Sequence, residues 1–142
     1  MLSKTYSRIL CALIFSLSAA FVSAPLAAQE RIIGVDEFES ISRGLTQYFY
    51  RDGEFFGAEQ FFENNQTIWM FANGQCEAGT WWEEEDYICF QYETLPEAQC
   101  WHMIEKDGTY FARLRDADPN FDLELRFVDR SDIPCEGPNL GV

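Results

Sequence analysis

The fold is decided by residues 67–82, which read TIWMFANGQCEAGTWW. Two runs rich in aromatic and β-branched residues, 67–72 and 76–82, flank the dipeptide Asn73-Gly74. Such runs are typical of strands, and Asn-Gly supplies the positive φ angles that a tight hairpin needs. The stretch therefore predicts two antiparallel strands joined by a short turn.

The same pattern continues on both sides of this hairpin. Asp52-Gly53 and Asp107-Gly108 are turn signals of the same kind, and short polar links separate the other runs. Short links join antiparallel neighbours, because parallel strands need long crossovers. We expect a mainly β fold, an antiparallel meander of about eight strands that forms a small barrel or a strongly curved sheet. The expected strands are residues 45–51, 58–63, 67–72, 76–82, 87–93, 100–105, 109–115 and 121–129.

One short helix is expected before the first strand. Asp36 can cap its N-terminus, and Gly44 can end it. Its apolar side chains fall on one face, at Val35, Phe38 and Ile41. We therefore expect this N-terminal helix to cover one end or one face of the β-structure.

Residues 1–28 have the order of a secretory signal peptide. Lys4 and Arg8 form a basic segment, an apolar run follows, and small residues lead to Ala28. The apolar run is too short for a spanning helix. We expect cleavage after Ala28, a periplasmic or secreted protein with no membrane span after cleavage, and a single domain over residues 29–142.

Four cysteines remain after that cleavage: Cys76, Cys89, Cys100 and Cys135. In an oxidising compartment an even set of cysteines predicts two disulfides that staple a small domain. Zinc is disfavoured because no two cysteines have the close spacing of a zinc knuckle, and no C-x-x-C motif supports a redox role. Strand register favours the pairs Cys76–Cys100 and Cys89–Cys135, the second of which would pin an extended tail, residues 131–142.

The chain is strongly acidic, with 24 acidic and 10 basic residues and a net charge of −14. Cleavage would remove two basic residues and no acidic one, so 8 basic against 24 acidic residues give −16. Nucleic acid and anionic membrane surfaces need a cationic footprint, so neither is expected as a partner. The 13 Phe, 6 Tyr and 4 Trp provide enough apolar surface for a folded core.

No catalytic set emerges, and the glycines form no phosphate-binding loop. His102 is the only histidine, and it lies in an expected strand. Alternating oxygen ligands, typical of the start of a calcium loop, occur at Asp116, Asp118, Asn120 and Asp122. The EF-hand pattern is broken at Phe121 and Phe127, so the alternative is a polar turn between two strands. No cofactor is expected, and calcium is the one for which the sequence offers ligands.

Tryptophans are the remaining candidate binding residues: Trp69, Trp81, Trp82 and Trp101. Trp81 and Trp82 must point to opposite faces of a strand, so one belongs to the core. The other is exposed, or is covered by the helix or the tail. An exposed tryptophan would mark a binding surface.

Four motifs carry a resemblance: Cys76-x-x-Gly79-x-Trp81, Ile88-Cys89-Phe90-x-Tyr92, Gln99-Cys100-Trp101 and Cys135-x-Gly137-Pro138. With them, and with its Gly-Val end, the chain resembles a family of short exported bacterial proteins of unknown function. Some members are labelled dihydrodipicolinate reductase. That activity is not expected here, because the chain lacks the glycine-rich strand–loop–helix start typical of such a nucleotide-binding enzyme. The resemblance implies no catalytic residues.

Three functions fit these observations. The first is a non-enzymatic exported domain that binds a protein or an envelope partner. The second is a lipocalin-like barrel that holds a small apolar ligand, which requires a hollow interior. The third is a hydrolase that uses paired carboxylates.

Overall fold

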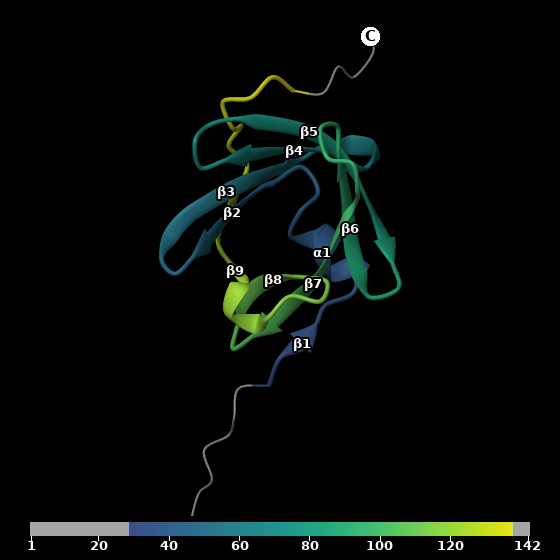
Figure 1. Ribbon diagram of the computed structural model, residues 1–142, viewed down its shortest axis with the longest axis vertical. Coiled ribbons are helices and arrows are strands. Elements are labelled where there is room, and N and C mark those ends of the chain that lie inside the picture. The colour runs from purple at the N-terminus through teal and green to yellow at the C-terminus, as the bar shows by residue number, and fades with distance from the viewer. Residues whose placement is uncertain (1–28, 138–142) are drawn as a thin grey trace, which may run out of the picture.

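The computed structural model describes residues 29–137, and its strands β2 to β9 follow one another around a closed ring (Figure 1). All neighbours are antiparallel, and pairing of β9 with β2 closes the ring. The prediction of an antiparallel meander is confirmed, and of the two shapes considered the barrel is correct. The strands are β2 (Thr46–Arg51), β3 (Glu54–Phe61), β4 (Gln66–Phe71), β5 (Cys76–Glu84), β6 (Tyr87–Tyr92), β7 (Gln99–Lys106), β8 (Thr109–Leu114) and β9 (Leu123–Asp129).

Three short elements add to this ring. Strand β1 (Arg31–Ile32) pairs antiparallel with β7 and was not predicted, because two residues show no periodicity. The 3-10 turns η1 (Glu63–Asn65) and η2 (Pro119–Phe121) link β3 to β4 and β8 to β9. They leave the order of the barrel strands unchanged.

Strand β3 begins earlier than expected, at Glu54 instead of residue 58. Asp52 and Gly53 both adopt positive φ, so the chain reverses in two residues and the strand resumes at once. Gly57 lies inside the strand because a side chain there would meet the Trp69 ring, 2.2 Å from an ideal Cβ. Here glycine makes room for a neighbouring ring and does not mark a turn.

Helix α1 (Val35–Ser40) closes one end of the barrel. Phe38 is fully buried, and its ring centre lies 5.5 Å from that of Phe61 and 5.1 Å from that of Trp81. The predicted apolar face is confirmed. The predicted Asp36 cap is wrong: the N-cap is Gly34, and no side chain caps the helix.

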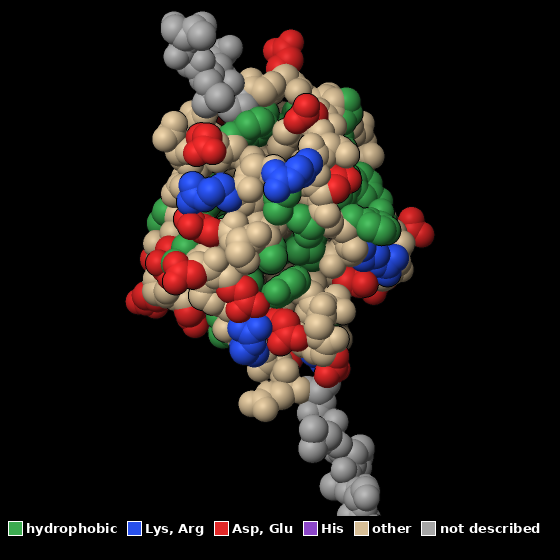
Figure 2. Space-filling view, turned by 180° about the vertical axis from the view of Figure 1, so that it is seen from behind, with side chains coloured by type: hydrophobic (Ala, Val, Ile, Leu, Met, Phe, Trp, Pro, Cys, Tyr) green, Lys and Arg blue, Asp and Glu red, His purple; other side chains and the backbone are tan. Residues whose placement is uncertain are grey.

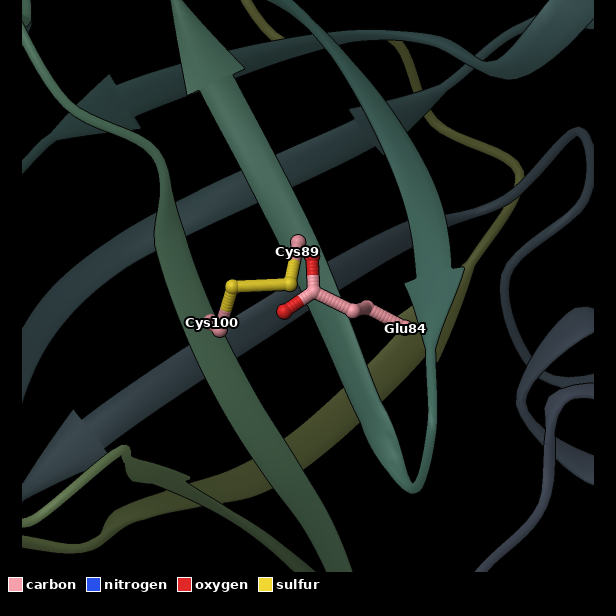
Figure 3. Close-up of side chains that lie close together, drawn as sticks. All are labelled: Glu84, Cys89 and Cys100. Atoms are coloured by element: carbon pink, nitrogen blue, oxygen red, sulfur yellow. A yellow bond between two sulfur atoms is a disulfide. The ribbon is translucent and has the colours of Figure 1, made fainter.

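The disulfides join Cys76 to Cys135 and Cys89 to Cys100, so the predicted pairing was wrong. Cys89 and Cys100 are direct partners in the register of β6 and β7 (Figure 3). Cys76 instead holds the tail, whose Ile133 packs with Ala58 on the outside of the barrel. The expectation that Cys135 pins the tail is confirmed.

Within residues 29–137, no helix has the length and apolar character needed to cross a membrane. The predicted signal peptide, residues 1–28, lies outside the described residues.

Figure 2 shows one face, where acidic side chains are spread around a strip of hydrophobic ones. The acidic residues on this face are therefore not gathered into one patch.

Candidate functional site: an aromatic cavity inside the barrel

The interior of the barrel is only partly filled, and a cavity of about 170 Å³ remains. Helix α1 forms its floor through Phe38. The opposite end is the mouth, where Phe71 of the lining is 39% exposed. The walls of the cavity are mostly aromatic and include Phe49, Phe61, Trp69, Phe90, Tyr92 and Trp101. An apolar cavity of about 150 Å³ is large enough to bind benzene.

Four polar side chains also line this cavity: Gln47, Glu59, Glu77 and Gln99. Alternation along each strand explains how they come to point inward. Gln47 and Glu59 are direct partners across β2 and β3, and Trp69 follows Glu59 across β4. Glu77 comes next, as the partner of Trp69 on β5. One wall thus carries three polar residues and a tryptophan at the same level.

Glu59 is the central polar residue, and it is only 3% exposed. Its Oε2 accepts a hydrogen bond from the Tyr92 hydroxyl at 2.7 Å. Its Oε1 is hydrogen-bonded to the Thr67 hydroxyl, which also reaches the carbonyl oxygen of Gln60 at 2.9 Å. No cationic side chain lines the described cavity.

Hydrogen counting around Thr67 indicates the protonation state of Glu59. A hydroxyl has one hydrogen to donate, and the Gln60 carbonyl can only accept. If Thr67 donates to the Gln60 carbonyl, its hydroxyl oxygen accepts a hydrogen bond from a protonated Glu59. A neutral carboxylic acid therefore satisfies all three groups.

Burial has the same consequence for Glu59. Desolvation of the carboxylate raises the pKa of Glu59 to about 8, against the lowering effect of its hydrogen bonds with Thr67 and Tyr92. Burial also raises the pKa of Tyr92 well above its ordinary value, and the neighbouring Glu59 raises it further. Both groups are thus neutral at pH 7, and the cavity holds a carboxylic acid beside a phenol.

The four tryptophans are divided between the two sides of the barrel wall. Trp69 and Trp101 line the cavity, and Trp81 is buried against α1. Trp82 points outward and is half-buried, in accordance with the alternation expected for neighbouring residues.

The predicted calcium ligands do not converge. Asp118 accepts the backbone N–H of Asn120 and so caps η2, while Asp122 is paired with Arg113 at 2.6 Å. Asp118 and Asp122 are thus engaged within the chain, as in the polar turn that was the alternative, and calcium binding by these residues stays a prediction.

In the described part of the chain, three potential ligand groups meet only at Glu84, Cys89 and Cys100. Figure 3 shows the Glu84 carboxyl group beside the disulfide. Both sulfur atoms are bonded to each other, so neither is a thiolate. This group is therefore a disulfide with a neighbouring acid and not a metal site.

His102 lies on the outside of β7, where its ring stacks on Tyr87 with 3.9 Å between ring centres. Its Nε2 is 3.1 Å from a carboxylate oxygen of Asp86. The histidine is thus placed away from the cavity, as a surface strand residue.

Sequence reasoning missed Glu59, Gln47 and Tyr92 as site residues. One signal was available: Gly57, Glu59 and Phe61 alternate, so the acid shares the face of an aromatic residue that belongs to the core. An acid on the core face of a strand is unusual, because burial of an ionised carboxyl group is costly. The starting residue of 58 predicted for this strand hid the alternation.

Comparison of the chain with protein-family models, with curated proteins and with solved structures finds no match in any of the three. The resemblance to short exported four-cysteine proteins therefore stays a prediction. The function has to be argued from the geometry of the cavity.

Proposed function

We propose that this domain binds a small apolar ligand inside its barrel. One observation carries the proposal: an aromatic cavity of about 170 Å³ surrounds a buried carboxyl group. Protein interiors are normally packed to the density of organic crystals, and a void in a small core lowers stability. A pocket with aromatic walls and a few polar groups is the usual form of a ligand site.

The volume limits the ligand. Sites for drug-sized molecules range over about 300–1,000 Å³, well above the size of this cavity. A benzene-sized molecule fits a cavity of about 150 Å³. The ligand is therefore a single ring or a compact aliphatic group, on the order of six to ten non-hydrogen atoms.

The proposal is tested by titration of toluene and indole into the purified, oxidised protein, followed by NMR. We expect saturable chemical-shift changes at the cavity residues Phe49, Trp69 and Phe90. The variant Leu123→Trp fills the cavity from β9 and should abolish these changes. Phe127→Trp is the matched control, because Phe127 lies on the same strand but is 58% exposed.

Two outcomes would contradict the proposal. One is the absence of saturable changes with either probe. The other is a set of changes confined to the outer surface. Both are read from the unmodified chain, so the test does not depend on whether Leu123→Trp folds.

The remaining functional predictions are unaffected by this proposal. Binding of a protein or an envelope partner stays a prediction, as do the periplasmic or secreted location and the absence of enzymatic activity. The hydrolase hypothesis, which needs paired carboxylates, also stays a prediction. The two acids that line the cavity are Glu59 and Glu77, and β4 lies between their strands.

A further inference from the structure

The polar groups of the cavity wall are short of hydrogen-bond donors. Gln47 is fully buried, and its Nε2 donates to the Ile41 carbonyl and to the Ser42 hydroxyl, each at 2.9 Å. Both amide hydrogens are thus used, while Oε1 is buried without a partner in the described chain. This oxygen can only accept, so a hydrogen-bond donor on a bound molecule would satisfy it.

Glu77 provides a second unpartnered acceptor at the same level of the cavity wall. Its Oε1 accepts from the Thr94 hydroxyl at 2.5 Å, and its Oε2 is buried without a partner among residues 29–137. The register places Gln47, Glu59, Trp69 and Glu77 side by side on β2, β3, β4 and β5. Two unpartnered acceptor oxygens, on Gln47 and Glu77, and the buried Glu59 carboxyl group therefore lie in the same wall as one tryptophan ring.

This wall suits a cation better than any other small group. Aromatic faces attract ammonium ions, and buried carbonyl and carboxyl oxygens accept their hydrogens. No lysine, arginine or histidine lies in the described cavity lining to compete for those oxygens. The whole chain has a net charge of −14, which raises the local concentration of cations and repels anions.

We infer that the ligand of this cavity is a small amine with an apolar ring, bound as its ammonium ion against Glu59, Gln47 and Glu77. This inference rests on the proposed function and names its ligand class. A cation beside a carboxyl group favours the charged form of that group, so Glu59 gives up its proton to solvent as the ligand enters. After binding, the ammonium ion and the Glu59 carboxylate have opposite charges. Their sum is zero, as was the charge of the protonated Glu59 before the ligand entered.

Four probes with the same ring separate the possible chemistries: benzylamine, benzyl alcohol, toluene and benzoate. We expect isothermal titration calorimetry at pH 7 to show benzylamine about 10- to 100-fold tighter than toluene or benzyl alcohol, the range given by a charge-assisted hydrogen bond. Benzoate should not bind measurably.

Proton release is the second readout. The titratable groups that line the cavity are Glu59, Glu77 and Tyr92. Because the pKa of Glu59 is about 8, benzylamine binding at pH 7 should release close to one proton. The number of protons is obtained by comparing the binding enthalpy in two buffers of different ionisation enthalpy. Benzylamine affinity should rise about tenfold from pH 6 to pH 7.

Glu59→Gln is the decisive variant, because an amide can accept from Tyr92 and donate to Thr67 as the neutral acid does. It should lose the benzylamine preference and the proton release while still binding toluene. Glu54→Gln is the matched control, since it removes an exposed acid from the same strand, and it should behave like the unmodified protein.

The outcomes distinguish this inference from the proposed function. If toluene binds and benzylamine binds no more tightly, the amine inference is wrong and the apolar-ligand proposal stands. Amine binding without proton release would likewise overturn the assigned role of Glu59. If none of the four probes binds in the barrel, the proposed function itself fails.

Discussion

Glu59 shows how strongly a single buried position can change the chemistry of a side chain. The carboxyl group lies between the hydroxyls of Thr67 and Tyr92, inside a wall of aromatic rings. Desolvation disfavours its charged form more than the two hydrogen bonds favour it. The residue is therefore an acid that keeps its proton at neutral pH.

This raised pKa gives a prediction for stability. The unfolded chain loses the Glu59 proton near pH 4.5, and the folded chain keeps it until about pH 8. Between these values the folded state binds more protons, so the free energy of unfolding should fall as pH rises, by about 1.4 kcal/mol per pH unit. Urea denaturation of the unmodified protein and of Glu59→Gln, from pH 5 to pH 8, measures this slope.

The variant Glu59→Gln should remove the slope and should be the more stable protein at pH 8. Some carboxyl groups have a lowered pKa, such as Glu30 beside Arg113 and Glu37 beside Arg31. These groups make the free energy of unfolding rise with pH, but only below pH 4.5. They therefore do not mask the effect between pH 5 and pH 8. Parallel curves for the two proteins would show that Glu59 is ionised in the folded state.

At the scale of the elements, the walls of the cavity depend on two glycines that make room for rings. Trp69 lies over Gly57 on the neighbouring strand, and Tyr92 lies over Gly79 in the same way. An ideal Cβ at Gly79 would be 2.7 Å from the Gln91 carbonyl oxygen and 2.8 Å from the Tyr92 ring. The glycines thus decide how closely the aromatic walls approach the strands.

Gly57→Ala should displace the Trp69 ring, because an ideal Cβ would lie 2.2 Å from that ring and 2.7 Å from the Met70 carbonyl oxygen. We expect a loss of about 1–3 kcal/mol in the free energy of unfolding, as for other overpacked cores. Chemical denaturation measures this loss, and tryptophan fluorescence reports the shift of the ring. Gly137→Ala is the control, since nothing lies within 4 Å of its ideal Cβ. Equal stability of the two variants would contradict this account.

At the scale of the whole molecule, two disulfides fasten different parts of one barrel. Cys89–Cys100 links neighbouring strands that are already paired, over a sequence separation of 11. Cys76–Cys135 spans a separation of 59 and holds the tail against the outer wall. The tail is also tied by the Thr46 hydroxyl, which donates to the Ser131 carbonyl at 2.7 Å.

The longer link should stabilise the molecule more, because it removes more conformational freedom from the unfolded chain. We expect the pair of changes Cys76→Ala and Cys135→Ala to lower the free energy of unfolding by about 4 kcal/mol, against about 3 kcal/mol for the shorter loop. Chemical denaturation compares the two double variants. In the variant without the longer link, hydrogen exchange should be faster at the backbone amide of position 135, which in the unmodified protein is the Cys135 N–H that donates to the Ile133 carbonyl at 2.8 Å. A tail that stays protected without the disulfide would contradict this role.

The amino-acid sequence by itself determined the strands, the tight hairpins, the antiparallel meander and the apolar face of α1. These features follow from local physics. Asp52-Gly53 and Asp107-Gly108 adopt the positive φ angles of two-residue turns, and the aromatic and β-branched runs favour extended backbone. The sequence also predicted that Trp81 and Trp82 point to opposite sides, because strand periodicity requires it.

Only the tertiary structure decided the closure of the ring, the cysteine pairing and the existence of the site. Each depends on which distant segments meet: β9 with β2, Cys135 with Cys76, and Tyr92 with Glu59. Among 24 acidic residues, the local sequence marks Glu59 only by its alternation with Phe61, and this does not reveal the partners of its carboxyl group. Its altered chemistry arises because eight strands enclose it, remove its water and leave it a tyrosine and a threonine as partners.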